Sequence, residues 1–192
     1  DIAITKYLQD KLTTLRYVIF GGEALNLSQL KPWFDYYSYD QPKLINMYGI
    51  TETTVHVTYK PIEEQDLGEN LYIGKIIPDL RAYVLSNNLV PLPIGATGVL
   101  YIGGVGLARG YLNKPELTEE RFIVNPFQTK EEKILSKNAR LYKTGDLVRW
   151  LPNGNLEYIG RNDFQVKIRG YRIELGEIES ALSLFEGIRQ SV

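Results

Sequence analysis

Residues 43–58 read KLINMYGITETTVHVT, a short apolar run that leads into a cluster of hydroxyl and acidic side chains. An earlier β-type run, LRYVIF (15–20), stops at Gly21 and Gly22. The segment between them, SQLKPWFDYY (28–37), begins with serine and has a proline in its first turn, which is typical of a helix. The sequence therefore predicts a strand–helix–strand unit with parallel strands, whose carboxyl ends are where α/β folds bind ligands.

The pattern changes after about residue 70, where short alternating segments rich in tyrosine and valine are separated by turn residues. These segments are LYIGK, RAYVLS, GVLYIGG, LVRWLP and NLEYIGR. They predict strands of a small barrel or a distorted sheet. We also expect a short helix at 114–122 and an exposed loop at 128–140. A β-hairpin is expected at 164–175, an amphipathic helix at 176–187, and a helix-like pattern covers 1–15.

Composition excludes several classes of protein. The chain has 192 residues, of which 44% are hydrophobic and 23% are charged, so it can bury a core. Its net charge of −1 argues against a nucleic-acid partner. No run reaches the roughly 18 apolar residues of a membrane span, and there is no signal segment at the front. We expect a cytoplasmic protein with neither a nucleic-acid nor a membrane partner.

The chain has no cysteine and one histidine, which limits its metal chemistry. Disulfides, cysteine-based metal sites and clusters of histidine ligands are all excluded. A Ser-His-Asp triad is not expected either. Any metal held here would be a hard ion with oxygen ligands, such as Mg²⁺.

Two local motifs leave alternatives open when each is taken alone. The stretch GVGLARG (104–110) has the wrong glycine spacing for a dinucleotide fingerprint and no helix after it, so a glycine-rich turn is the better interpretation. The cluster Thr51-Glu52-Thr53-Thr54 could be a helix cap or a solvated turn. It could also serve a nucleotide, with Tyr48 stacking on the base, Thr51 at a phosphate and Glu52 at Mg²⁺.

Two further segments near the end of the chain are equally open. Asp146, in LYKTGDLVRW (141–150), follows a Thr-Gly pair that reads as a turn. It is either a turn residue or an acceptor for the two hydroxyls of a ribose. The segment 160–163 lies between two β runs and is either a turn or a hinge.

Taken together, five blocks in a fixed order carry a resemblance that no single motif carries. The sequence resembles the adenylation domain of nonribosomal peptide synthetases, within the superfamily of acyl-adenylate-forming enzymes. The blocks are VIFGGEAL (18–25), NMYGITETTV (46–55), GVLYIGGVGLARGYLNKPELTEERF (98–122), RLYKTGDLVRW (140–150) and GNLEYIGRNDFQVKIRGYRIELGEIE (154–179). They cover nearly the whole chain.

The resemblance implies a two-step reaction. An amino-acid carboxylate attacks the α-phosphate of ATP, giving aminoacyl-AMP and pyrophosphate, and a phosphopantetheine thiol on a carrier protein then takes the aminoacyl group. The implied cofactors are ATP/AMP and Mg²⁺, which stabilises the charge that develops around phosphorus. The implied partners are an amino acid, a peptidyl carrier protein and neighbouring synthetase domains.

The resemblance also implies a role for individual residues. The residues expected to bind the nucleotide are Gly22, Glu23, Asn46, Tyr48, Asp146, Tyr158 and Arg161. The residues expected to act in catalysis are Thr51, at phosphate, and Glu52, at Mg²⁺. The Gly49 carbonyl would hold the substrate ammonium, Asp163 would be the hinge of the small subdomain, and Gly170 would lie on the loop that swings toward the pantetheine tunnel.

The same resemblance assigns five residues to the side-chain pocket of the substrate: Ile19, Gly21, Met47, Val55 and His56. This set is similar to the latter part of the pocket of threonine-activating domains. L-threonine is small, β-branched and carries one hydroxyl, which His56 could hydrogen-bond. Such a pocket rejects valine because valine would leave the polar group unpaired. Without the resemblance, His56 would be taken as a partly buried structural residue.

For the fold class, we expect an α/β layer plus a β-rich subdomain, together the C-terminal part of a large adenylate-forming subdomain and the start of a small mobile one. The expected ranges are 1–68 for the α/β layer, 69–162 for the barrel-like part and 163–192 for the start of the small subdomain. The family's phosphate loop, the upstream pocket wall and the C-terminal catalytic lysine have no counterpart here. The isolated chain is therefore expected to be inactive and prone to self-association.

Two other functions remain open at this point. One is an acyl- or aryl-CoA ligase of the same superfamily, which would use free coenzyme A as acceptor. The other is a non-catalytic remnant that binds nucleotide or a partner without turnover. The blocks at 107–122, 142–150 and 162–179 match the peptide-synthetase versions more closely, which favours the amino-acid-activating interpretation.

Overall fold

The computed structural model of the chain describes residues 14–35, 37–38, 42–67, 72–188 and 190. It begins with the predicted parallel pair. Strand β1 (Tyr17–Phe20) lies parallel to β2 (Lys43–Asn46) in continuous register, from Tyr17 opposite Lys43 to Phe20 opposite Asn46. The helix expected at 28–37 is shorter and starts as a 3₁₀ turn, η1 (Leu27–Leu30), followed by α2 (Lys31–Phe34). The expected helix over 1–15 falls almost entirely outside the described residues.

The chain then enters strands that join the two predicted regions into one sheet. A 3₁₀ turn, η2 (Thr51–Thr53), leads to β3 (Thr58–Pro61), and η3 (Glu64–Asp66) precedes β4 (Tyr72–Ile76). Strand β3 was not predicted, and it pairs antiparallel with both β2 and β4. The sheet is therefore continuous across the boundary expected at residue 68, and the division of the chain into 1–68, 69–162 and 163–192 stays a prediction.

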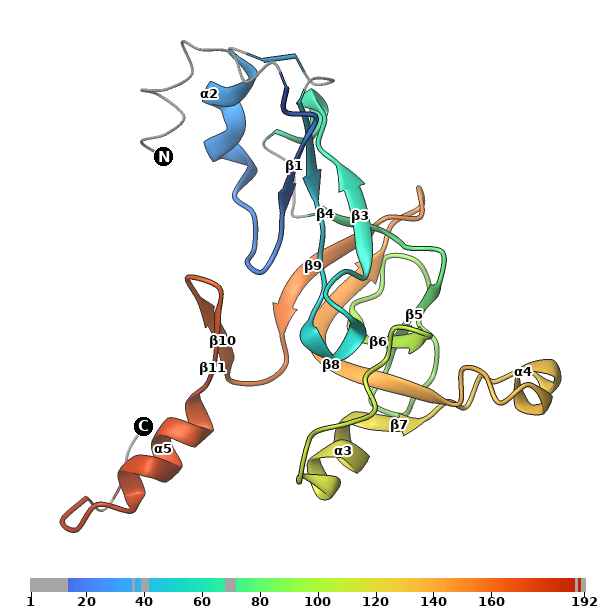
Figure 1. Cartoon of the computed structure of the whole chain (residues 1–192), viewed down its shortest axis with the longest axis vertical. Coiled ribbons are helices and arrows are strands. Elements are labelled where there is room, and N and C mark those ends of the chain that lie inside the picture. Colours follow the sequence, from blue (N-terminus) through green and yellow to red (C-terminus); the bar gives the residue numbers. More distant parts are fainter. Residues whose placement is uncertain (1–13, 36, 39–41, 68–71, 189, 191–192) are drawn as a thin grey trace.

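Among the described residues, the remaining strands complete one mixed sheet of nine strands (Figure 1). They are β5 (Leu80–Leu85), β6 (Gly98–Gly104), β7 (Phe122–Val124), β8 (Arg140–Trp150) and β9 (Leu156–Arg161). The strand order is β1-β2-β3-β4-β9-β8-β6-β5, with β7 attached to β8. The strands expected after residue 70 are confirmed, and the order leaves β1 and β5 at the ends of the sheet. The Thr144-Gly145 pair is not a turn, because β8 runs through it with Gly145 at a φ of 79°.

Two short helices flank this sheet. Helix α3 (Pro115–Arg121) lies in the segment where a helix was expected. The expectation of a loop over 128–140 was wrong for its first part, which holds α4 (Lys130–Ile134). The reason is a capping box: the Thr129 side chain accepts from the Glu132 backbone N–H, and the Glu132 side chain accepts from the Thr129 N–H. The Thr-x-x-Glu pattern that signals this box was present in the sequence.

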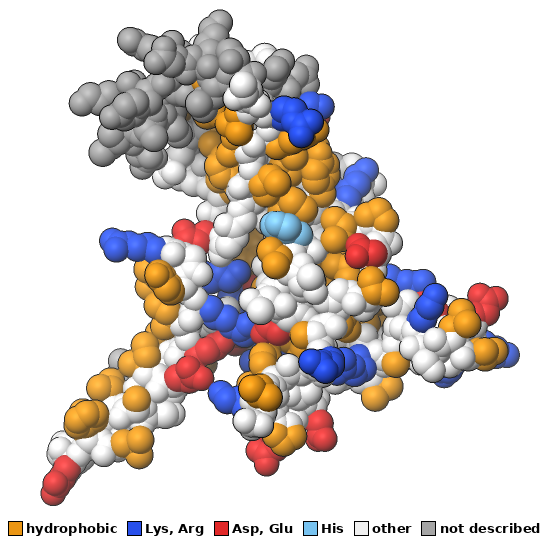
Figure 2. Space-filling view, in the orientation of Figure 1, with side chains coloured by type: hydrophobic (Ala, Val, Ile, Leu, Met, Phe, Trp, Pro, Cys, Tyr) orange, Lys and Arg blue, Asp and Glu red, His pale blue; other side chains and the backbone are white. Residues whose placement is uncertain are grey.

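The last part of the chain forms an arm that extends away from the large sheet in Figure 1. It consists of the predicted hairpin, β10 (Gln165–Ile168) and β11 (Tyr171–Glu174), followed by α5 (Leu175–Ser183). Apolar side chains of α5 and the residues after it are exposed, including Ile178 at 48% and Phe185 at 69% (Figure 2). The arm therefore contributes little to the buried core.

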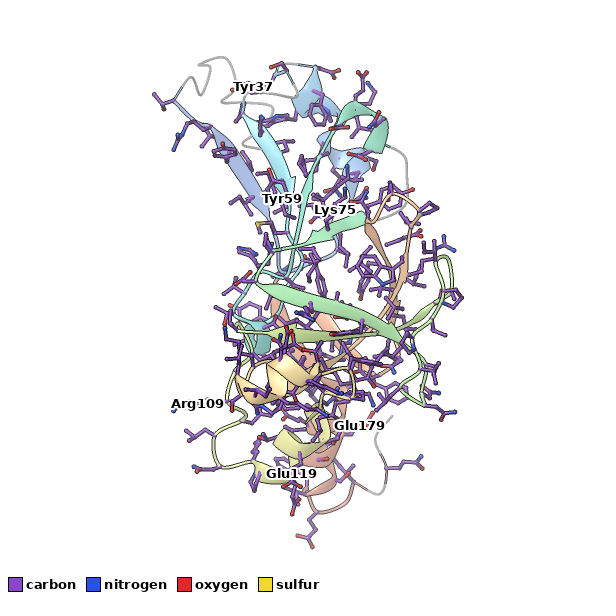
Figure 3. The ribbon with its side chains drawn as sticks, turned by 90° about the vertical axis from the view of Figure 1, so that its right-hand side faces the viewer. Tyr37, Tyr59, Lys75, Arg109, Glu119 and Glu179 are labelled. Carbon is purple, nitrogen blue, oxygen red and sulfur yellow. The ribbon has the colours of Figure 1, made fainter. Side chains whose placement is uncertain are left out.

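The buried core is divided among three clusters. One packs η1 and α2 against the parallel strands, with Trp33 and Leu44 among its members. The largest lies within the antiparallel part of the sheet and includes Leu100 and Val148, both with no exposed surface. Figure 3 shows Tyr37 at one end of the molecule and Arg109 and Glu119 at the other, with this antiparallel region between them. The described part of the chain contains no helix long and apolar enough to cross a membrane.

We predict that the antiparallel core dominates the stability of the fold. Leu100 is 0% exposed and Leu112 is 88% exposed. Leu100→Ala should lower the free energy of unfolding by about 2–5 kcal/mol, because it removes buried methyl groups and leaves a cavity. Leu112→Ala is the matched control and should change it by less than about 0.5 kcal/mol. Urea unfolding of both variants measures the difference, and equal effects would contradict the core assignment.

Candidate active site

A cleft of about 600 Å³ lies at the carboxyl end of β2, between the large sheet and the hairpin arm. Its lining comes from the loop after β1, the loop after β2, strands β4, β8 and β9, and the start of β10. Ten residues of the predicted site line it: Gly22, Glu23, Asn46, Met47, Tyr48, Gly49, Asp146, Tyr158, Arg161 and Asp163. The structure thus brings together residues from four of the five sequence blocks.

Seven residues of the predicted site are not part of this lining: Ile19, Gly21, Thr51, Glu52, Val55, His56 and Gly170. Thr51 is exposed, as are Ile19 at 55% and Val55 at 61%. Glu52 is buried and is hydrogen-bonded to Tyr111, Tyr142 and Arg172, as described below. Gly170 lies at the tip of the hairpin, where its N–H donates to the Glu23 carboxylate at the cleft.

The loop after β2 folds back on itself, and its conformation depends on glycine. A Cβ on Gly49 would lie 1.8 Å from the Val55 carbonyl oxygen, so no other residue fits there without rearrangement. Thr54 and Val55 have φ values of 59° and 70°, in the left-handed region that costs energy for β-branched residues. The Val57 N–H closes the loop by donating to the Tyr48 carbonyl. Strained backbone of this kind is concentrated at functional sites.

The floor of the cleft is a network of charges centred on Asp146, which is 2% exposed. Arg161 donates from Nη1 to Asp146 Oδ1 at 2.7 Å, and the Tyr48 hydroxyl donates to Asp146 Oδ2. Arg161 also holds Asp163 with two hydrogen bonds, at 2.6 and 2.7 Å. Gly145 leaves the room for this pair, because a Cβ there would lie 2.6 Å from Asp163 Oδ2.

Burial and hydrogen bonding shift the pKa values of the side chains in this network. Burial raises the pKa of Asp146, and the hydrogen bond from Tyr48 and the charge of Arg161 offset only part of that effect. Burial also raises the pKa of Tyr48 well above its ordinary value, so the phenol remains a hydrogen-bond donor. Burial would raise the pKa of Asp163 too, but its hydrogen bonds with Arg161 dominate and lower it. Perturbed groups gathered in a cleft are typical of a functional site.

The second charged centre is Glu52, a residue that is 5% exposed. Its Oε1 accepts from the hydroxyls of Tyr111 and Tyr142, at 2.6 and 2.9 Å, and from Arg172 Nη1 at 2.6 Å. Its Oε2 is buried and has no hydrogen-bond partner among the described residues. Burial would raise the pKa of Glu52, but the hydrogen bond from Tyr111 and the charge of Arg172 outweigh it, so the pKa lies below its ordinary value.

These residues fit a divalent cation that takes most of its ligands from elsewhere. In the part of the chain that the structure describes, no three histidine, aspartate or glutamate side chains come together as a cage. Glu52 Oε2 nevertheless offers one anionic oxygen without a partner. Mg²⁺ is usually held by one or two carboxylates together with water and substrate phosphates. Arg172 already supplies a positive charge to the same carboxylate.

The residues assigned to the substrate side chain meet beside the cleft. A Cβ on Gly21 would lie 3.1 Å from the Met47 carbonyl oxygen and 3.8 Å from His56 Cε1. These three residues therefore surround the space that Gly21 leaves open. The Nδ1 atom of His56 is buried without a hydrogen-bond partner in the described structure. An unpaired buried nitrogen is costly, and a ligand could satisfy it.

Sequence reasoning missed several residues of both centres. Lys167 and Gln165 line the cleft from β10, and the charge of Lys167 lowers the pKa of Asp146. Arg172, from β11, reaches Glu52 across 120 positions of sequence. The predicted hairpin was the available signal, since alternate residues of a strand share a face. Nothing in the sequence alone pairs Tyr111 and Tyr142 with Glu52, because they come from separate blocks.

Comparison with protein families gives one match, over residues 2–112, to the family described as "AMP-binding enzyme". Among curated proteins, the chain is 57% identical to malpinin synthetase from Mortierella alpina over 184 residues, which cover 95% of this chain and 2% of that protein. It is 55% identical over 171 residues to a dimodular nonribosomal peptide synthase from Bacillus subtilis (strain 168), covering 88% of this chain and 7% of that protein. The chain thus spans less than a tenth of the length of these relatives.

Among solved structures, the chain matches holo-PA1221, which is described as an NRPS protein containing adenylation and PCP domains. The TM-score is 0.80 at 30% identity, and the match covers 92% of this chain and 29% of that one. The expected fold class, part of an adenylate-forming domain with a mixed α/β sheet, is confirmed by this likeness.

We predict that Glu52 makes stability depend on pH in acid. Its pKa lies below the ordinary value of 4.5, so its contribution is full above that value and is lost as the pH falls through the lower, folded-state pKa. Wild-type and Glu52→Gln proteins should therefore differ in free energy of unfolding at neutral pH and converge in acid. Urea unfolding from about pH 3 to about pH 7 measures this. A difference that stays constant over that range would contradict it.

Proposed function

Since the chain belongs to the AMP-binding enzyme family, we propose that it is part of an adenylation domain that activates an amino acid with ATP and loads it on a carrier protein. The observation that carries the proposal is the Asp146 cleft, where buried and titration-shifted groups from separate blocks converge. Two of the relatives named above, a nonribosomal peptide synthase and a protein containing a PCP domain, support the carrier protein as partner. The phosphopantetheine thiol of that partner is then the second acceptor.

In this proposal the cleft binds the nucleotide through the chain's own donors and acceptors. Asp146 accepts hydrogen bonds from the two ribose hydroxyls, for which the Tyr48 hydroxyl must release Oδ2. Tyr48 then stacks on the adenine, Asn46 and the Gly22-Glu23 backbone contact its edge, and Tyr158 lines the same space. Asn46 is already oriented, because its side-chain nitrogen donates to the Tyr72 carbonyl at 3.1 Å.

The reaction joins the substrate carboxylate to the α-phosphorus and releases pyrophosphate. Arg161 places positive charge at the ribose and phosphate side of the cleft, and Thr51 offers a hydroxyl to phosphate. Glu52 Oε2 would ligate Mg²⁺, which when bound supplies charge stabilisation to the phosphates. The Gly49 carbonyl accepts from the substrate ammonium. Asp163, paired with Arg161, serves as the hinge of the arm, and Gly170 carries the loop that faces the thiol.

For the amino acid, we propose L-threonine. The support is the space beside Gly21 together with the unpaired Nδ1 of His56. A threonine hydroxyl satisfies that nitrogen, whereas valine leaves it buried and unpaired, which costs affinity. Met47 and Ile19 supply apolar contacts for the methyl group, and Val55 lies at the end of the same loop.

The nucleotide site is tested first on the chain itself. Asp146→Asn should weaken AMP binding by about tenfold or more, because a charged acceptor of two hydrogen bonds becomes neutral. Asp35→Asn is the matched control, because Asp35 lies outside the cleft and forms an exposed pair with Lys31 at 3.8 Å. AMP affinity should not change in this variant. Calorimetry gives both dissociation constants. Absence of AMP binding by the wild type, or equal losses in the two variants, would overturn the proposed site.

The substrate is tested by amino-acid-dependent exchange of pyrophosphate into ATP. The chain replaces its aligned segment in the B. subtilis dimodular synthase, to which it is 55% identical. Threonine should support more exchange than serine, valine or an aryl acid. His56→Ala should lower the ratio of exchange with threonine to exchange with valine by about tenfold. Tyr59→Ala, on the exposed face of β3, is the control.

The outcomes of that experiment separate the alternatives. Exchange with another amino acid would keep the activity and contradict threonine. Turnover only with a carboxylic acid plus free coenzyme A would assign the chain to the acyl- or aryl-CoA ligases. Binding of AMP with no exchange in any chimera would favour the alternative that the chain is a non-catalytic remnant.

A further inference from the structure

The Glu52 carboxylate is held asymmetrically. All three of its side-chain donors, the Tyr111 and Tyr142 hydroxyls and Arg172 Nη1, converge on Oε1. Oε2 is buried and has no partner among the described residues. An acceptor left unpaired in a buried position is unfavourable, and its presence in a site calls for a physical explanation.

The two tyrosines are placed by packing that is independent of Glu52. The Tyr142 side chain has no exposed surface, and its ring packs against Phe122 at a centroid distance of 4.9 Å. The Tyr111 ring meets the edge of the same Phe122 at 5.8 Å. One phenylalanine thus fixes both rings, so that their hydroxyls lie 3.0 Å apart. The phenol oxygens are in position before any ligand arrives.

The loop that carries Tyr111 is also tied down at its backbone. The Tyr111 N–H donates to Thr118 Oγ1 at 2.9 Å, and the Ala108 N–H donates to the Glu52 carbonyl at 2.9 Å. Arg140 lies over the Phe122 ring and donates to the Ala108 carbonyl at 3.0 Å. The backbone of Glu52 and the loop of Tyr111 are therefore fixed relative to each other.

The two tyrosine hydroxyls have one hydrogen each to donate. If both donate to Oε1, the 3.0 Å contact between them carries no hydrogen bond. The two phenol oxygens lie 2.6 and 2.9 Å from Oε1, so each can donate its hydrogen to that atom. Arg172 differs from them because it is 36% exposed at the side chain and comes from the hairpin arm. It is the one donor of the three that can leave without disturbing the sheet.

We propose that Tyr111 and Tyr142 are positioning residues that hold Oε1 of Glu52 and thereby reserve Oε2 for a divalent cation. The proposal rests on the proposed function, since it takes the cation to arrive with the phosphates of ATP. With the tyrosines in place, Glu52 keeps one orientation whether its positive partner is Arg172 or the cation. Without them, the carboxylate is free to rotate about its last torsion, and either oxygen can face the protein.

The test compares two ligands on the full chain: AMP in the absence of divalent ions, and ATP with Mn²⁺. Tyr111→Phe and Tyr142→Phe should each weaken Mn²⁺·ATP binding by about tenfold, as is typical when a residue that orients a metal ligand loses its hydrogen bond. Both should leave AMP binding unchanged, because AMP brings no cation. Calorimetry measures both affinities, and the spin resonance of Mn²⁺ reports the bound ion directly. AMP binding also shows that each variant is folded.

Two controls make the result specific to the hydroxyls. Tyr101→Phe removes a hydroxyl from another buried tyrosine, 4% exposed and in a separate core cluster, and should change neither affinity. Glu52→Gln removes the proposed ligand, so adding Tyr111→Phe to it should cause no further loss. Such a double-mutant cycle isolates the pair.

Each other result decides the matter. Equal weakening of AMP and Mn²⁺·ATP by the tyrosine variants would show a structural role and overturn the proposal. The proposal would also be overturned if Tyr111→Phe weakened Mn²⁺·ATP binding equally in the Glu52→Gln background. It would be overturned likewise if Glu52→Gln left Mn²⁺·ATP binding unchanged. In both cases the proposed nucleotide site would still stand. If the wild type binds neither ligand, the proposed function fails and this proposal fails with it.

Discussion

The need to compensate buried carboxylates shapes the functional half of this structure. Asp146 and Glu52 are both nearly inaccessible to solvent, and an unpaired charge in such a place is strongly unfavourable. Each therefore has an arginine from later in the chain, Arg161 for Asp146 and Arg172 for Glu52. The Arg172–Glu52 pair ties the hairpin arm to the loop after β2. Asp146, which Arg161 pairs within the sheet, accepts a hydrogen bond from Tyr48 of the same loop. The position of the arm follows from charge compensation, because its apolar residues are mostly exposed.

The two arginines differ in position and in exposure. Arg161 ends β9, is almost buried, and links Asp146 to Asp163 where the arm begins. Arg172 lies in the arm and is more exposed. In the proposed function, nucleotide at Asp146 and a cation at Glu52 both act on groups that these arginines hold. The same contacts that stabilise the unliganded chain are then the contacts that ligands must alter.

The sequence predicted the elements better than it predicted the connections between them. The parallel β1–β2 pair and the hairpin were predicted from short β-type runs and the glycines that end them, since such local patterns determine strand positions. Strand β3 was missed because TYKP is short and ends in proline, and α4 was missed although its Thr129–Glu132 capping box was visible. The Asp146 cleft was predicted through the ordered blocks. The tyrosine pair on Glu52 was not, because contacts 59 and 90 positions apart arise only from the tertiary fold.

The proposed function requires the cleft at the end of β2 to bind the nucleotide part of an adenylate. Backbone NMR of the isotopically labelled chain, titrated with AMP, tests it without relying on turnover. The account predicts saturable shifts concentrated at Gly22 and Glu23, at Tyr48, and around Asp146 and Tyr158, which line that cleft. Shifts confined to other surfaces, or no shifts at millimolar AMP, would contradict it.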